Sequence, residues 1–211
     1  NNYPTMEAIG ALRSLGWQLS EAKELVVTHR HFGIGYKAFI QSIEQGILLP
    51  QEILEHCDTL ATFSESLGNL TRLFLSQPMH DVHKTARTWM EEAGMQVRID
   101  AIGNIIGHYS GRTENAKTLL IASHLDTVKN AGKYDGMLGV LVGIAAVKAL
   151  GNERLPFTID VIGFSEEEGV RYGKPFFGSK AVIGEFENAW LELRDSEGIS
   201  LREAIQSFGL N

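Results

Sequence analysis

Two short apolar runs flank a long apolar segment in the middle of the chain, and this pattern restricts the fold more than any other feature. The runs over 117–122 and 157–164 have the length of buried strands, and Pro156 precedes the second. Residues 136–150 are apolar nearly all round and are long enough for a buried helix. Strand, helix and strand in this order predict a parallel pair of strands in an α/β layer.

The segments around this unit complete the expected fold. Helical spacing over 50–64 and 80–92 predicts two helices, and alternation over 95–100 and 105–109 predicts two strands around the Gly103-Asn104 turn. A last helix begins at Ser200, where Glu203 three residues later has the form of a capping box. We therefore expect an α/β fold with a mixed, largely parallel sheet flanked by helices. Residues 1–48 form a separate helical extension of unknown role, and residues 49–211 carry the sheet.

Composition excludes several classes of protein. The 211 residues include 19 basic and 26 acidic side chains. The resulting net charge of −7 does not favour binding to nucleic acid or anionic lipid, which are themselves negatively charged. The single cysteine, Cys57, rules out a disulfide framework or a zinc site with several cysteines. No apolar run approaches the roughly 18 residues of a membrane span, and the first residues do not form a signal peptide. A cytoplasmic enzyme without nucleic-acid or membrane partners is the expectation.

Polar side chains follow both strands of the central unit. His124 and Asp126 come after the first strand, Asp135 precedes the buried helix, and Glu166–Glu168 follow the second strand. Since ligands bind at the carboxyl ends of strands in an open α/β sheet, these groups are expected to converge. A histidine with several carboxylates suits Zn²⁺, Mn²⁺ or Co²⁺.

Each of these motifs also has an ordinary structural explanation. A His-x-Asp pair occurs in surface turns, and three successive glutamates usually lie on the solvent-exposed surface of a protein. Adjacent carboxylates at the mouth of a buried strand, however, repel one another and need a cation to offset their desolvation. His80 and His83 have only Asp81 nearby, so we interpret them as exposed residues of a first helical turn rather than as ligands.

Three motifs resemble a known superfamily. The sequences Ser-His-Leu-Asp-Thr-Val, Asn-Ala-Gly-Lys-Tyr-Asp-Gly and Ser-Glu-Glu-Glu-Gly-Val-Arg-Tyr begin at positions 123, 130 and 165. They resemble the two-metal amidohydrolases of the aminoacylase and carboxypeptidase superfamily, in the branch of the allantoate amidohydrolases and N-carbamoyl-L-amino acid hydrolases. The resemblance extends from about residue 50 to residue 211 and includes Arg72 and Gly178-Ser179. The segments over 130–139 and 190–209 are more similar to the allantoate amidohydrolases.

The resemblance implies two divalent metal ions, Mn²⁺ or Zn²⁺ with Co²⁺ as an alternative. It makes His124 a ligand of one metal, Asp135 the carboxylate that bridges both, and Glu168 a ligand of the second. Glu167 matches the general base, and Asp126 matches the carboxylate that orients His124.

Gly178 and Ser179 match positions on the substrate side, although a simple strand-to-helix turn is an equally good interpretation. The family uses five metal ligands, and three are found here. The other two are histidines beyond residue 211. We therefore expect the chain to be the N-terminal part of a longer enzyme, and we expect this part to end near the boundary of a lid domain.

The implied activity is hydrolysis of the ureido C–N bond of allantoate, in purine catabolism, by an enzyme that dimerises through the lid domain. Two alternatives stay open. The same scaffold also serves N-carbamoyl-L-amino acid hydrolases and peptidases. A module that retains only the first three ligands would instead bind metal without catalysis.

Overall fold

The computed structural model describes residues 50–211. Residues Ile53–Asn211 form one compact unit, and all the features discussed below lie in it except the first residues of α4. The helical extension expected over 1–48 lies outside the described residues.

The described residues form a four-stranded mixed sheet in the order β1-β2-β4-β3. Its strands are β1 (Gln96–Ile99), β2 (Ile105–Tyr109), β3 (Thr118–His124) and β4 (Thr158–Phe164). β3 and β4 pair in parallel, as the strand-helix-strand pattern predicts, whereas β1–β2 and β2–β4 pair antiparallel. The mixed α/β class is confirmed, but the described sheet is not largely parallel, because β3–β4 is its one parallel pair and the β1–β2 hairpin adds antiparallel pairs.

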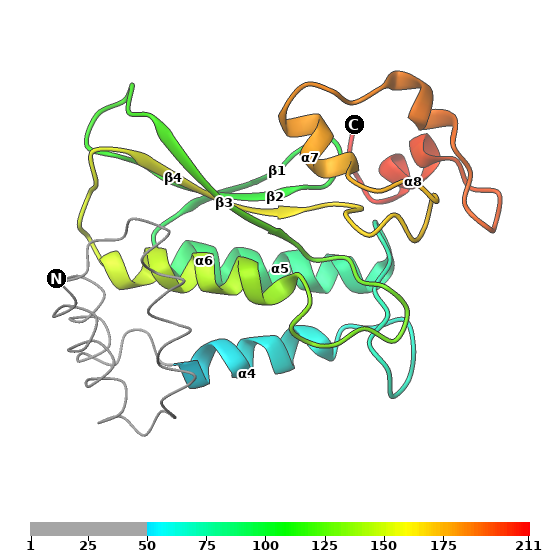
Figure 1. Cartoon of the computed structure of the whole chain (residues 1–211), viewed down its shortest axis with the longest axis horizontal. Helices are drawn as coiled ribbons and strands as arrows, with labels where there is room; N and C mark the ends of the chain where they lie inside the picture. Colours follow the sequence, from blue (N-terminus) through cyan, green and yellow to red (C-terminus); the bar gives the residue numbers. More distant parts are fainter. Residues whose placement is uncertain (1–49) are drawn as a thin grey trace, which may run out of the picture. The chain divides into compact units, whose positions relative to one another are not determined.

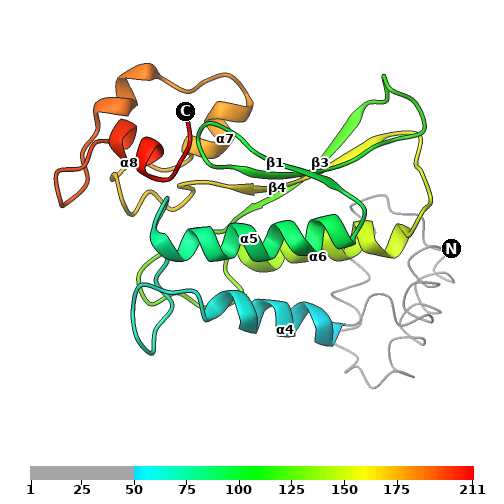
Figure 2. The same ribbon diagram turned by 180° about the vertical axis from the view of Figure 1, so that it is seen from behind.

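Helices cover one face of this sheet. α5 (Gln77–Glu92) and α6 (Met137–Leu150) lie side by side on that face, and α4 (Pro50–Ala61) lies beyond them (Figures 1 and 2). α6 buries Val140, Leu141 and Ile144 among the sheet and helix side chains of the hydrophobic core. Burial of this nearly uniform apolar helix is the main reason why β3 and β4 lie together.

Shorter elements gather on the other side of the sheet, beside the end of β4. They are α7 (Phe177–Val182), the 3₁₀-helix η1 (Asn188–Glu192) and α8 (Leu201–Ser207) (Figure 1). The Phe177 and Trp190 rings stack at 5.5 Å and anchor this group. The predicted capping box of α8 is confirmed, because Ser200 Oγ accepts the Glu203 N–H at 3.2 Å and Glu203 Oε2 accepts the Ser200 N–H at 2.7 Å.

The prediction for His83 is wrong. His80 is exposed, but His83 is buried, because it belongs to the stripe of α5 that also buries Met79, Val82 and Ala86. Both imidazoles contact the Phe208 ring, so they help to attach the end of α8 to α5. Among the described helices, none has the length and apolar character required to cross a membrane.

Candidate metal centre

The register of β3 and β4 brings the predicted motifs together. His124 is the last residue of β3 and lies beside Phe164, the last residue of β4. Because the strands are parallel, the residues that follow each of them leave the sheet at the same edge. The turn over 124–127 therefore lies next to the turn over 165–168.

Asp126 connects these two turns. Its side chain is only 2 % exposed, and its carboxylate oxygens accept the N–H groups of Glu167 at 3.2 Å and Glu168 at 3.1 Å. Burial raises the pKa of Asp126, and the two backbone hydrogen bonds oppose that rise. The carboxylate thus fixes the backbone of both glutamates that the resemblance assigns to catalysis and metal binding.

The imidazole of His124 is oriented by the backbone of Asp126. His124 Nδ1 lies 2.9 Å from the Asp126 carbonyl oxygen and 4.0 Å from the carboxylate Oδ1. Since a carbonyl only accepts, Nδ1 is the donor, and Nε2 of the neutral ring carries the free lone pair. Asp126 lies where the resemblance places an orienting residue, and its carbonyl makes the short contact.

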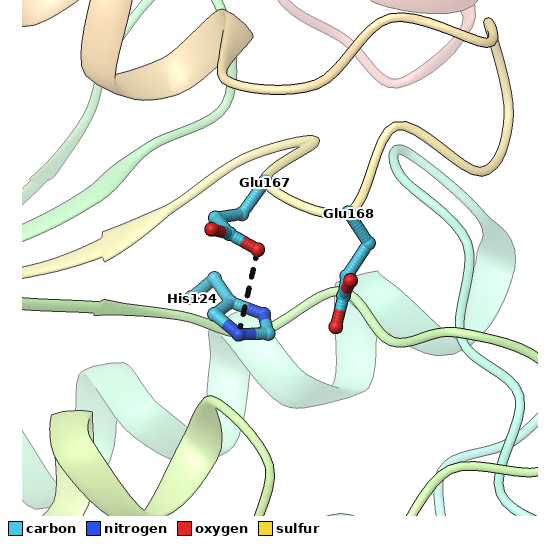
Figure 3. A group of neighbouring side chains, drawn as sticks. All are labelled: His124, Glu167 and Glu168. Atoms are coloured by element: carbon cyan, nitrogen blue, oxygen red, sulfur yellow. Dashed lines mark ion pairs between the residues drawn. The ribbon is translucent and has the colours of Figure 1, made fainter.

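His124 Nε2 faces two carboxylates. Glu167 Oε2 lies 3.7 Å away and Asp135 Oδ1 lies 3.8 Å away. Among residues 50–211, His124, Glu167 and Glu168 offer ligand atoms that all lie within 4.8 Å of one another (Figure 3). In Figure 3 the Glu167 carboxylate points toward the imidazole, and Glu168 projects from the next position of the same turn.

The electrostatics of this group suit a cation. Partial burial raises the pKa of Glu168, and the neighbouring charges of Asp135, Glu167 and Asp126 add to the rise, while His124 opposes it. One imidazole nitrogen with several carboxylates is a donor set that binds Zn²⁺, Mn²⁺ or Co²⁺. The residues present therefore fit a divalent metal ion.

Asp135 reaches the site from a loop. An isolated bridge between Ala131 and Leu70 and an ion pair between Lys133 and Asp58 hold the base of this loop. At its end, Gly136 has a φ of +72°, and a Cβ there would lie 2.5 Å from atoms of the His124 ring. Glycine is required at this position because both the backbone angle and the imidazole exclude a side chain.

Glu166 does not lie in the cluster with His124, contrary to the expectation that all three successive glutamates converge there. It is buried with a φ of +48°, and its Oε1 accepts the N–H groups of Arg171 at 3.1 Å and Tyr172 at 3.0 Å. Burial raises the pKa of the Glu166 carboxyl to about 7. It therefore supports the turn from inside the protein, while the next two glutamates face the cluster. Ser165, which separates Glu166 from β4, is buried as well, so the alternation of a strand does not single out Glu166.

Gly178 and Ser179 lie at the start of α7. Gly178 is buried, and its carbonyl accepts a hydrogen bond from Asn104 Nδ2 at 3.0 Å. Asn104 Oδ1 in turn accepts the Ser165 N–H at 2.9 Å, so this contact ties α7 to the end of β4. Ser179 Oγ donates to the Phe176 carbonyl at 3.3 Å. These contacts are structural, and a role in substrate binding stays a prediction.

Comparisons with known proteins place this geometry in a family. Residues 104–194 match the model of peptidase family M28. The chain is 38 % identical over 163 residues to allantoate deiminase 1 of Glycine max, covering 75 % of this chain and 34 % of that protein. It is 41 % identical over 147 residues to an N-carbamoyl-L-amino acid amidohydrolase of Geobacillus stearothermophilus, covering 68 % and 36 %.

Solved structures agree with the sequence relatives. A hydantoinase/carbamoylase family amidase from Burkholderia ambifaria superposes with a TM-score of 0.71 at 29 % identity, over 75 % of this chain and 40 % of that chain. AtUAH in complex with (S)-hydroxyglycine gives a TM-score of 0.71 at 28 % identity, over 76 % and 39 %. The chain spans about a third of the length of the curated relatives that it matches first.

Proposed function

The chain belongs to the allantoate amidohydrolase and N-carbamoyl-L-amino acid hydrolase branch of the two-metal amidohydrolases, and we propose that its natural protein hydrolyses the ureido C–N bond of allantoate. The products are ammonia, CO₂ and ureidoglycine or ureidoglycolate. The observation that carries this proposal is the convergence of His124, Glu167 and Glu168 at the ends of two parallel strands. Allantoate deiminases among the relatives support the choice of substrate.

The residues of the chain have separate roles in this proposal. His124 and Asp135 would hold one divalent ion, and Asp135 and Glu168 would hold a second, with Mn²⁺ or Zn²⁺ as the ions. Bound there, the ions supply Lewis-acid polarisation of the scissile carbonyl. Glu167 accepts the proton of the attacking water and delivers it to the leaving nitrogen. Asp126 keeps Glu167 and Glu168 in place through their N–H groups.

The wider biological setting belongs to the same proposal. The protein acts in purine catabolism in the cytoplasm, on a small ureido substrate, and works as a homodimer. The residues over 49–211 form the N-terminal segment of its catalytic domain. A second candidate substrate class, the N-carbamoyl-L-amino acids, is favoured by the 41 % identity to an N-carbamoyl-L-amino acid amidohydrolase.

An assay of the complete natural protein separates these two substrate classes. With Mn²⁺, Zn²⁺ or Co²⁺ added in turn, ammonia release from allantoate is compared with amino-acid release from N-carbamoyl-L-amino acids. Faster turnover of allantoate supports the main proposal, and faster turnover of the carbamoyl compounds supports the second. Turnover of neither would contradict both, and a divalent metal ion bound at the cluster without any turnover would favour a module without catalysis.

A variant of the general base tests the roles. Glu167→Gln should retain the metal content of the wild type and lose roughly 10²- to 10⁴-fold in kcat, because proton transfer to and from a positioned carboxylate contributes about that much. Glu114→Gln, an exposed glutamate in the turn before β3, is the matched control and should retain wild-type turnover. A Glu167→Gln enzyme with more than a tenth of wild-type kcat would remove Glu167 from this role.

A further inference from the structure

Arg72 is a fully buried arginine whose side chain binds carbonyl groups. Its Nε donates to the Leu125 carbonyl at 2.9 Å, and its Nη1 donates to the carbonyls of Leu60 at 2.8 Å and Phe63 at 3.0 Å. Leu60 lies near the end of α4, and Leu125 is the residue that follows His124. The guanidinium therefore connects α4 to the turn that leaves β3.

The backbone of Arg72 binds the same turn at a second point. Its N–H donates to Thr127 Oγ1 at 2.9 Å, and its carbonyl accepts the Thr127 N–H at 2.9 Å. Leu125 and Thr127 are the two neighbours of Asp126. Three hydrogen bonds of Arg72 thus hold both sides of the residue that orients His124 and binds the N–H groups of Glu167 and Glu168.

We propose that Arg72 is a positioning residue for the metal centre, which holds the turn over 124–127 in the conformation that presents His124 and Glu168 to a divalent ion and fixes the backbone of Glu167. This inference rests on the proposed function. Arg72 acts through Asp126 and does not itself contact the cluster of ligand atoms.

The energetics of Arg72 support a role beyond packing. Desolvation lowers the pKa of its guanidinium to about 10, and the negative charge of Asp126 opposes this effect. Within residues 50–211, its Nη2 is buried with no hydrogen-bond partner. A well-packed apolar side chain would avoid both of these costs, but it would remove the donors to the carbonyls of Leu60, Phe63 and Leu125. What an apolar side chain cannot provide is the rigid, planar set of donors that fixes several carbonyls at once.

Two substitutions weaken this connection by different routes. Arg72→Lys retains the charge but loses the planar fork, and Thr127→Val retains the shape of the side chain but removes the hydroxyl acceptor. Val147→Ala is the control for lost stability, because Val147 is buried in the last turn of α6, at the opposite end of this helix from Gly136. All three are compared in the complete natural protein.

The first readout is the dissociation constant for Mn²⁺, measured by competition with a chelator. We expect Arg72→Lys to weaken binding by roughly 10- to 100-fold, the range for residues that hold a metal ligand in place, and Thr127→Val to weaken it by less. Val147→Ala should lower the unfolding temperature without changing the dissociation constant by more than about twofold.

The second readout uses metal-free protein. The amides of Glu167 and Glu168 should exchange hydrogen several-fold faster in Arg72→Lys and Thr127→Val than in Val147→Ala. If either variant shifts only the unfolding temperature, as Val147→Ala does, Arg72 is structural and the proposal is overturned. Should Arg72→Lys fail to fold, Thr127→Val decides on both readouts.

Failure of the proposed function would appear differently. A wild-type protein that binds no divalent ion and hydrolyses no ureido substrate contradicts the proposed function, whatever the variants do. A wild-type protein that binds and hydrolyses, together with Arg72→Lys and Thr127→Val proteins of unchanged affinity and exchange, contradicts the role of Arg72 alone.

Discussion

The two halves of the candidate metal centre are held in different ways. The strand-end half consists of the turns after β3 and β4, where Asp126 is 2 % exposed and makes backbone hydrogen bonds of 3.1 and 3.2 Å. The loop half carries Asp135, whose side chain is 55 % exposed and lies 3.8 Å from the imidazole. Hydrogen bonds within the protein therefore fix the first half, whereas Asp135 is constrained mainly through its loop.

The largest effect is expected when the strand-end half is disturbed at its centre. Asp126→Asn replaces one acceptor oxygen with an NH₂ group that faces a backbone N–H, so one of the two hydrogen bonds becomes a repulsive contact. We expect metal affinity to fall by roughly 10- to 100-fold. Titration of the metal-free protein with Mn²⁺ measures this change.

The control for this substitution is Asp195→Asn. Asp195 is also nearly buried, and its Oδ1 accepts two backbone N–H groups, from Glu197 and Ile199, each at 3.0 Å. It lies in the turn before α8, so its substitution should lower stability while metal affinity stays within about twofold. Equal losses of affinity in both variants would show that Asp126 has no special part in the site.

Acid should act on a buried histidine of α5, His83, which contacts Phe208. Burial, together with the smaller effect of the positive charges of His80, Arg87 and Arg72, lowers the pKa of His83 to about 3. Between this value and the ordinary pKa of about 6.5, the unfolded chain binds a proton that the folded chain does not. The contribution of His83 is therefore fully present above pH 6.5 and is lost progressively as the pH falls through that range.

We expect His83 to lower the free energy of unfolding by about 2 kcal/mol between pH 8 and pH 5. This value follows because pH 5 lies about 1.5 units below the ordinary pKa of histidine, and each unit corresponds to about 1.4 kcal/mol. Urea unfolding of the metal-free wild type and His83→Leu at both pH values measures it. The difference between the two proteins should change by that amount. Parallel changes with pH in both proteins would mean that His83 is protonated in the folded state.

Gly136 joins the two halves, and its substitution should have an intermediate effect. Gly136→Ala places a Cβ against the His124 ring at a φ of +72°, so the loop or the imidazole must move. We expect about tenfold weaker metal binding, in line with displacement of one ligand. Gly132→Ala in the same loop is the matched control, because a Cβ there meets nothing within 4 Å. Similar metal affinities of the Gly136→Ala and Gly132→Ala proteins would show that the site does not depend on the close approach of Gly136 to the His124 imidazole.

The strand-end half could be predicted from the sequence because its elements are local. The order of strand, helix and strand places the residues after each strand at one edge of the sheet, and this is where His124 and Glu168 lie. The antiparallel hairpin of β1 and β2 also follows from a local turn. The apolar character of α6 was sufficient to predict its burial.

What could not be predicted depends on contacts between distant segments. The hydrogen bond from Arg72 to Leu125 joins residues 53 positions apart, and no local pattern indicates it. His83 was misjudged because its burial depends on where the end of α8 packs against α5. The contact of His124 with the carbonyl rather than the carboxylate of Asp126 is a feature of backbone conformation that side-chain types do not encode.

The smallest effect is expected at the base of the loop half. Lys133 and Asp58 form an ion pair whose side chains are 41 % and 57 % exposed. Exposed pairs of this kind contribute little, since water and salt screen the charges, whereas the bridge between Ala131 and Leu70 holds the same loop through the backbone. Lys133→Ala should therefore leave the Mn²⁺ dissociation constant within about twofold of the wild type. A tenfold loss of Mn²⁺ affinity at low ionic strength that disappears in 0.5 M salt would contradict this expectation. It would show that the ion pair of Lys133 with Asp58, rather than the backbone bridge, holds the loop that carries Asp135.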